Sequence, residues 1–145
     1  MTNAIALDTT EVAAHLRLAV TRLARKLRRE TEGGLSPTML SALASVERHG
    51  PLTIGELCAH EQVSGPTMTR IVANLAETGL LSRDVDLGDR RVAWVSITAE
   101  GLRVLSRARR RKEAYLAKRL RTFSPEELEL LDRASSLLDS IAESR

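Results

Sequence analysis

Residues 53–101 of this chain read TIGELCAHEQVSGPTMTRIVANLAETGLLSRDVDLGDRRVAWVSITAEG, and this stretch decides the fold. A capping box, in which Thr53 is followed three residues later by Glu56, marks the start of a short helix. After a tight turn at 61–63, Ser64 begins a second helix. Two capped helices that are separated by such a turn are typical of a helix-turn-helix.

A hairpin is predicted directly after the second helix. Its strands are residues 81–86 and 92–97, and residues 86–89 have the composition of a turn. Thr98 then caps a long helix that we expect at about 99–121. The order of these elements predicts a winged helix-turn-helix in which the hairpin is the wing.

Further helices are predicted on both sides of this stretch. Apolar residues spaced by three and four form a stripe along residues 10–31, where Gly33-Gly34 ends the helix. Another helix begins at Ser36-Pro37, and the last begins at Ser124. The fold class is therefore mainly α with a small β-hairpin wing, arranged as one domain over 1–145.

Composition excludes several classes of protein. With 43% hydrophobic and 28% charged residues the chain is expected to be globular. Its net charge of +3 is compatible with a nucleic-acid partner but does not require one. The single cysteine excludes an internal disulfide, and no apolar run reaches the roughly 20 residues of a membrane helix. We therefore expect a cytoplasmic protein without a membrane contact.

The sequence offers no pattern of an enzyme or a metal site. We find no nucleophile–base pair, no phosphate-binding loop and no spacing of His15, His49 or His60 that suits a metal. Cys58 is expected to be a small buried hydrophobe, with a redox-sensing thiol as the alternative. The basic run at 107–112 is expected to be a solvated or ion-paired surface, with a phosphate contact as the alternative.

The chemistry that the sequence does offer suits duplex DNA. In a helix-turn-helix, the start of the second helix meets the base edges of the major groove. In this chain the residues at that position are Ser64, Gly65, Pro66, Thr67, Thr69 and, one turn in, Arg70. The wing carries Arg90 and Arg91, whose charge suits a narrow minor groove, and Asp89 is able to hold one of them.

A second interpretation stays open because the local charge is balanced. Between Ser64 and Arg91, four arginines are matched by four acidic residues. A winged-helix module that is used mainly for protein–protein contacts is therefore the alternative function.

The same motifs resemble the MarR family of bacterial transcription regulators. The residues that carry the resemblance are 63–72 (VSGPTMTRIV), Leu75, Gly79-Leu80-Leu81, Arg83, Asp86, Asp89-Arg90-Arg91 and the ITAEG ending at 97–101. The resemblance implies a sequence-specific, ligand-responsive repressor that binds a near-palindromic operator as a homodimer. It also implies that Arg90 enters the minor groove, braced by Asp89 and Arg91, and it adds Arg83 to the DNA-binding residues.

The resemblance further divides the chain into two lobes. Residues 36–97 would form the winged helix-turn-helix lobe, and 10–32 with 102–144 a helical dimerisation lobe. The dimer contacts would come from the two apolar stripes, at Val12, Leu16, Leu131, Leu138 and Ile141. No cofactor is expected, and the effector would be a small aromatic or phenolic compound.

Two positions depart from the family pattern. Glu61-Gln62 stands where the family often has Leu-Gly, so the turn must form without glycine. Gly88 stands where the wing tip often carries a further basic residue, which predicts a lower affinity for the minor groove.

Overall fold

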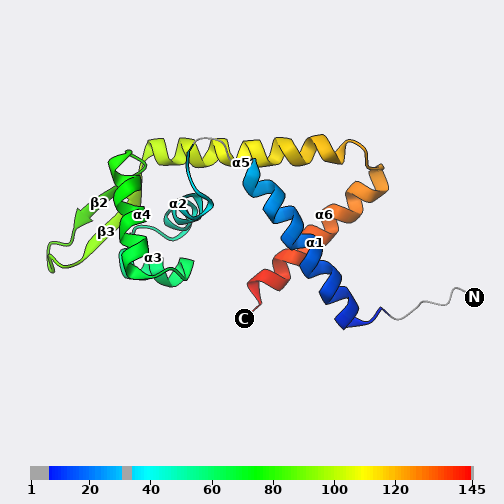
Figure 1. The fold of residues 1–145 in the computed structure, drawn as a ribbon, viewed down its shortest axis with the longest axis horizontal. Coiled ribbons are helices and arrows are strands. Elements are labelled where there is room, and N and C mark those ends of the chain that lie inside the picture. The colour runs from blue at the N-terminus through cyan, green and yellow to red at the C-terminus, as the bar shows by residue number, and fades with distance from the viewer. Residues whose placement is uncertain (1–6, 31–33, 145) are drawn as a thin grey trace, which may run out of the picture. The chain divides into compact units, whose positions relative to one another are not determined.

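The computed structural model describes residues 7–30 and 34–144, and it confirms a mainly helical chain with a small antiparallel sheet (Figure 1). The elements in chain order are α1 (Thr9–Arg29), α2 (Pro37–His49), β1 (Leu52–Thr53), α3 (Ile54–Glu61), α4 (Gly65–Glu77), β2 (Leu81–Val85), β3 (Ala93–Ile97), α5 (Ala99–Leu120) and α6 (Pro125–Glu143). The chain forms two compact units, Met1–Lys112 and Glu113–Arg145.

The predicted helix starts are confirmed by hydrogen bonds. The Ser36 hydroxyl accepts from the backbone N–H of Met39 at the start of α2. Complete capping boxes join Thr53 with Glu56 and Ser124 with Glu127. Since each cap satisfies amides that the first helical turn leaves without partners, these short sequence patterns fix where the helices begin.

Some predicted boundaries were wrong by one or two residues. The first helix ends at Arg29 rather than at residue 31, and Gly33 lies outside the described residues. The strands end at Val85 and begin again at Ala93, because the backbone N–H of Asp86 already closes the turn. That N–H donates to the carbonyl oxygen of Val92 at 2.8 Å.

The sheet contains a third strand that the sequence did not indicate. The two residues of β1 pair antiparallel with β3, so that Leu52 lies opposite Val95 and the strand order is β1-β3-β2. A strand of two residues is too short to show alternation, which explains why it was missed. Through β1, the hairpin is joined to the segment that begins α3.

The core lies between α2, α3, α4 and the sheet. Leu43, Leu57 and Val95 are completely buried. From α4 the predicted inward face is confirmed, since Met68, Ile71, Val72 and Leu75 are all buried. The fixed inward face leaves the opposite face of α4 and its N-terminal end accessible.

The beginning of α5 is tied to the end of the helix-turn-helix. The Thr98 hydroxyl donates to the carbonyl oxygen of Gly79 at 2.6 Å and accepts from the backbone N–H of Gly101 at 3.0 Å. A side chain at Gly101 would collide with the carbonyl oxygen of Leu80, so glycine allows this close approach. Further along α5, Arg109 contacts Glu47 of α2 at 2.6 Å, so part of the basic run is ion-paired as predicted.

The apolar stripes of α1 and α6 are not covered within the described chain. Neither helix has a buried residue. On the α6 stripe Leu131 and Ile141 are exposed, the latter with 60% of its surface, and Leu138 is half-buried. On α1, Val12, Val20 and Leu23 are exposed in the same way. Exposed apolar side chains along one stripe of a helix suit a surface that a partner covers.

Candidate nucleic-acid interface

The turn between α3 and α4 forms without glycine, as expected from the sequence. Gln62 adopts the left-handed conformation with φ of 52°, and its N–H donates to the carbonyl oxygen of Cys58. The N–H of Val63 donates to the same oxygen at 3.3 Å. Because a non-glycine residue is disfavoured in this region by about 1–2 kcal/mol, other contacts must hold the turn in place.

The N-terminal end of α4 is open to solvent. Ser64, Gly65, Pro66, Thr69 and Arg70 are exposed, and Thr67 is half-buried. The hydroxyl of Ser64 donates to Oγ1 of Thr67 at 3.0 Å and makes no cap bond, so the expectation that such hydroxyls act as caps was wrong here. With Pro66 in the first turn and a free space around Gly65, this end can approach another surface closely.

Asp86 organises the wing, a role that local sequence patterns did not fully indicate. Its Oδ2 accepts from the backbone N–H groups of Gly88 at 3.0 Å and Asp89 at 2.9 Å. Its Oδ1 accepts from Nε1 of Trp94 on β3 at 3.1 Å. Three bonds to one carboxylate hold the tip of the hairpin in a single conformation. The turn composition indicated the two backbone bonds, but the contact with Trp94 depends on the strand register.

Asp89 holds Arg91 and leaves Arg90 available. Oδ1 of Asp89 accepts from both the backbone N–H and Nε of Arg91, at 3.0 and 3.1 Å, and Oδ2 accepts from its Nη2. Arg90 is exposed and makes no ion pair or hydrogen bond with the described part of the chain. Asp89 therefore restrains Arg91, whose side chain stays 90% exposed, whereas the guanidinium of Arg90 has no partner among the described residues.

Both wing carboxylates are stabilised in the charged form. The pKa of Asp86 is lowered, first by the bond from Trp94 and then by the backbone N–H groups of the turn. The pKa of Asp89 is lowered by the bonds from Arg91. Hydrogen bonds to a charged carboxylate favour that form, so the wing is organised wherever both groups are ionised.

We predict that acid releases Trp94 from Asp86. Because the pKa of Asp86 is lowered on folding, its contribution is present above the ordinary aspartate value of about 3.9 and is lost as the pH falls through the lowered pKa. The emission of Trp94, the chain's one tryptophan, should change with a midpoint below that value.

Two variants test this assignment. Asp86→Ala should alter the emission already at neutral pH, whereas Asp132→Ala, which removes an exposed carboxylate from α6, should not. Unchanged emission in Asp86→Ala would show that the contact does not hold the wing.

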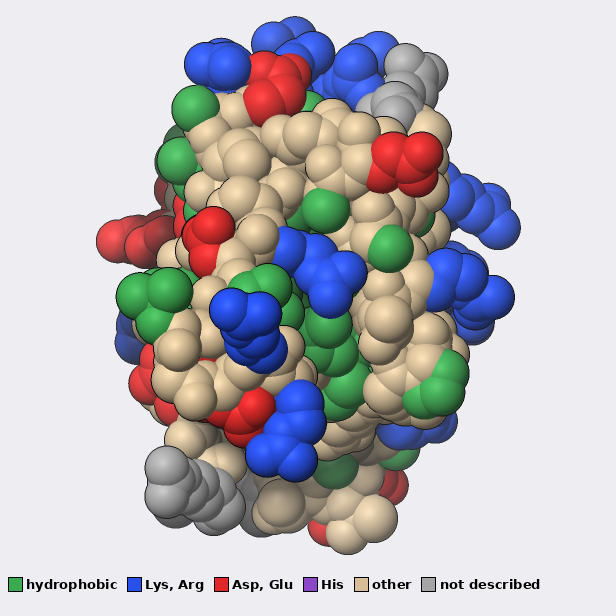
Figure 2. Space-filling model, turned by 90° about the vertical axis from the view of Figure 1, so that its left-hand side faces the viewer, with side chains coloured by type: hydrophobic (Ala, Val, Ile, Leu, Met, Phe, Trp, Pro, Cys, Tyr) green, Lys and Arg blue, Asp and Glu red, His purple; other side chains and the backbone are tan. Residues whose placement is uncertain are grey.

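Figure 2 shows the face that carries the end of the molecule with α3, α4 and the hairpin. Lys and Arg side chains project from the middle of this face, with Asp and Glu side chains among them. Arg83 is exposed on β2, opposite Val95 in the register and away from the wing tip. The surface is thus basic by the placement of particular side chains and not by an excess of charge.

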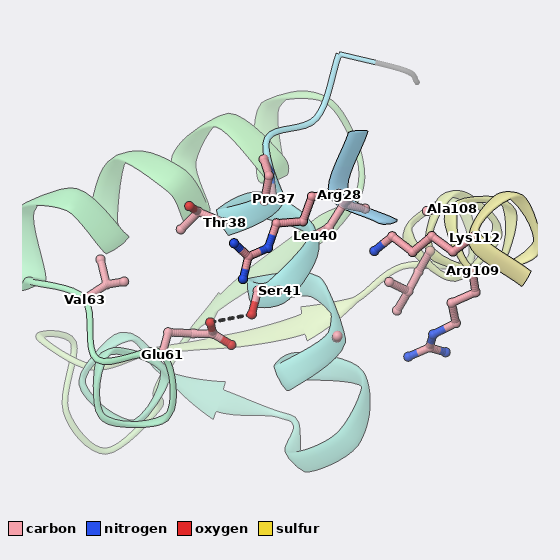
Figure 3. A pocket seen from close by; sticks show the side chains of 12 residues that line it. Arg28, Pro37, Thr38, Leu40, Ser41, Glu61, Val63, Ala108, Arg109 and Lys112 are labelled. Atoms are coloured by element: carbon pink, nitrogen blue, oxygen red, sulfur yellow. Dashed lines mark hydrogen bonds between the residues drawn. The ribbon is translucent and has the colours of Figure 1, made fainter. Parts of the chain in front are cut away.

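A pocket of about 570 Å³ is lined by residues of α1, α2, α5 and the turn before α4 (Figure 3). Its lining combines apolar side chains such as Leu40 and Leu105 with the cations Arg28, Arg109 and Lys112. Glu61 and Val63 also contribute to it, which places the turn before α4 in the wall of the pocket. In Figure 3 the guanidinium of Arg28 reaches toward Ser41 and Glu61.

Other candidate residues show no such arrangement. Cys58 is half-buried and packs against the core, close to the expected small hydrophobe. The rings of His49 and His60 stack with their centroids 4.3 Å apart. Within residues 7–30 and 34–144, no three histidine, cysteine or acidic side chains gather as metal ligands, and no helix is long and apolar enough to cross a membrane.

Comparison with known proteins finds transcriptional regulators. The sequence profile of the MarR family matches residues 35–93. An uncharacterized HTH-type transcriptional regulator of Mycobacterium leprae is 38% identical over 128 residues, which is 88% of this chain and 90% of that protein. The transcriptional repressor MdtR of Bacillus subtilis is 30% identical over 95 residues, 66% of this chain and 61% of that protein.

The likeness extends to a solved structure. A protein of Pseudomonas aeruginosa that was crystallised as a candidate transcriptional regulator superposes with a TM-score of 0.83 at 31% identity. The match covers 94% of this chain and 96% of that one.

Proposed function

Because this chain belongs to the MarR family of HTH-type transcriptional regulators, it is a DNA-binding regulator and not an enzyme, and we propose that it is a homodimeric, ligand-responsive repressor of a near-palindromic operator. In this proposal α4 reads the major groove through its N-terminal residues, and Arg90 enters the adjacent minor groove. The protein would act in the cytoplasm, where bacterial DNA is accessible to it.

The arrangement of the wing is the main support for the proposal that Arg90 enters the minor groove. Asp86 fixes the hairpin tip through three hydrogen bonds, and Asp89 holds Arg91. Arg90 is then the wing arginine whose guanidinium is open to a partner. A fixed cation on a narrow hairpin suits the concentrated negative potential of a narrow minor groove.

The uncovered stripes of α1 and α6 support the homodimer. A second copy of the chain offers the same stripes, so a two-fold arrangement covers both at once. Such a dimer would present two recognition helices for half-sites roughly 34 Å apart, one turn of DNA. The two-fold symmetry of such a dimer is the reason for expecting a near-palindromic operator.

The pocket supports the response to a ligand. Its mixture of apolar walls and the cations Arg28, Arg109 and Lys112 suits a small aromatic acid or phenolate. Its wall includes Glu61 and Val63, which flank the turn before α4, so an occupant would act next to the DNA-reading element. The relative that is named as a repressor supports repression as the direction of control.

We predict that an aromatic acid bound in this pocket raises the melting temperature and weakens operator binding. Benzoate and hydroxybenzoates are suitable probes, because each joins an apolar ring to an anionic group. Lys112→Ala, which removes one lining cation, should reduce both effects, whereas Lys26→Ala, which removes an exposed lysine of α1 outside the pocket, should not. A panel of such acids that shifts neither quantity would argue against this part of the proposal.

The proposed function is tested by a gel-shift titration against the DNA immediately upstream of the chain's own coding region. Scrambled DNA of the same length is the control, and two salt concentrations are compared. We expect tight binding to the upstream DNA that weakens as salt rises, because phosphate contacts release counterions. Weak and equal binding to both DNAs would show that the protein has no operator immediately upstream of its own coding region.

The balanced charge between Ser64 and Arg91 favours one other function, a winged-helix module for protein contacts. This alternative predicts that DNA affinity is weak on every sequence. A selection from genomic fragments distinguishes the two functions, because only an operator-binding protein enriches a defined sequence.

A further inference from the structure

The C-terminal end of α3 is attached to α2 by a pair of serines. Oε2 of Glu61 accepts from the Ser41 hydroxyl at 2.6 Å, and Oε1 accepts from the Ser45 hydroxyl. Ser41 and Ser45 are four residues apart on α2 and therefore lie on the same side of that helix. Each carboxylate oxygen has one hydroxyl donor, and the Ser41 bond is visible in Figure 3. We call these three residues the serine–glutamate bracket.

Glu61 occupies a place where an acidic residue is otherwise unfavourable. It is the last residue of α3, and a negative charge at a helix C-terminus opposes the helix dipole. The next residue, Gln62, adopts a left-handed conformation that glycine would adopt more easily. The sequence at 61–62 is therefore poor for this turn on local grounds, and contacts outside the turn must compensate for it.

The bracket lies next to the DNA-reading end of α4. Only residues 62–64 separate Glu61 from Gly65, the first residue of α4. The inner face of α4 is held by the core, but its exposed N-terminal end is held through this short turn. A shift of the end of α3 would therefore also move the N-terminal residues of α4, which are the ones proposed to contact the bases.

We propose that the serine–glutamate bracket positions the N-terminal end of α4 for operator recognition. Glu61 acts as a positioning residue: it does not contact DNA, and it acts by holding the turn against α2. This inference rests on the proposed function, since it assigns the bracket a role in operator binding.

If Glu61 acted only through its charge, replacing it would strengthen DNA binding, whereas a positioning role predicts weaker binding. Removing an acidic residue from a DNA-binding protein reduces repulsion of the phosphates and should strengthen binding to any DNA. If Glu61 positions α4, Glu61→Ala should instead weaken operator binding. The sign of the change in operator affinity therefore separates the two views.

The experiment measures affinity for operator and scrambled DNA in Glu61→Ala, in the double variant Ser41→Ala/Ser45→Ala, and in the triple variant. We expect each of the first two to lose about 10-fold in operator affinity, because recognition residues must be held closely in place. The double variant changes no charge, so its salt dependence should match that of the wild type. The triple variant should bind no more weakly than Glu61→Ala, since all three residues act through one contact.

A matched control is Glu113→Ala, which removes one exposed acidic side chain from α5 and should keep operator affinity. Glu61→Gln, which keeps one acceptor oxygen, should lose less affinity than Glu61→Ala. Equal or tighter operator binding in Glu61→Ala would overturn the inference. Additive losses in the triple variant would also overturn it.

Amide hydrogen exchange provides a readout that does not depend on DNA. Breaking the bracket should speed exchange at the hydrogen-bonded amides of Gln62, Val63 and Met68 and leave the amides of β3 unchanged. Faster exchange throughout the core, or no change at the turn, would contradict a positioning role. If the wild type did not distinguish operator from scrambled DNA, the proposed function would fail, and the exchange data would still decide whether the bracket holds the turn. If Glu61→Ala does not fold, the double serine variant decides instead.

Discussion

Replacing Arg90 by alanine should lower operator affinity by about 10- to 100-fold, the range expected when a DNA-contacting arginine is lost. Both wing arginines are exposed, but Arg91 is held by Asp89 at 3.1 Å, whereas Arg90 makes no bond with the described residues. The variant should therefore lose a cation that the wing delivers to the minor groove without altering the wing itself. The slope of affinity against salt should also fall by about 1, because one fewer phosphate-bound counterion is released.

The measurement compares wild type, Arg90→Ala and a control in gel-shift titrations at several salt concentrations. Arg133→Ala is a suitable control, because it removes the same charge from an exposed position on α6. Its operator affinity should stay within a few-fold of the wild type. If Arg90→Ala behaved like Arg133→Ala, the wing would not insert its arginine into the groove.

Placing a charge on the α6 stripe should lower operator affinity as much as Arg90→Ala does, or more. Ile141 has 60% of its surface exposed and lies on the predicted interface with Leu131 and Leu138. In Ile141→Asp, a dimer would bury an unpaired carboxylate, so we expect a monomer. Since two linked half-site contacts bind about 10²- to 10⁴-fold more tightly than one, operator affinity should fall by a factor in that range.

Sedimentation velocity measures the assembly and gel shift measures the affinity of the same samples. Ser136→Asp introduces the same carboxylate on the same helix, about half a turn away from the stripe, and should remain a dimer. A wild type that is monomeric at all concentrations would reject the interface. So would an Ile141→Asp variant that remains dimeric.

Local sequence patterns predicted the elements of this fold well, because the interactions that begin helices are local. The capping boxes at Thr53 and Ser124 depend on residues three positions apart, and both are present as predicted. The inward face of α4 followed from helical periodicity for the same reason. Asp89 was predicted to hold one wing arginine, and its bond to Arg91 is formed, but neither Asp89 nor Arg91 bonds to Arg90 in the described residues, as bracing of Arg90 would require.

The features that the sequence did not indicate depend on contacts between distant residues. The pairing of β1 with β3 joins Leu52 to Val95, and neither residue carries a signal for the other. The bonds from Ser41 and Ser45 to Glu61 cross 20 and 16 positions of the chain. From sequence, Glu61 was a departure from the family pattern that weakened the turn. The structure shows that its partners lie on α2, which periodicity within α3 cannot reveal.

We propose that this chain recognises a defined operator as a dimer through α4 and the wing. The most direct test is an in vitro selection of genomic DNA fragments by the purified protein, followed by sequencing of the bound fraction. We expect enrichment of one near-palindromic sequence whose half-sites are about one turn of DNA apart, and loss of this enrichment in Arg90→Ala. Recovery of fragments with no shared sequence would contradict it.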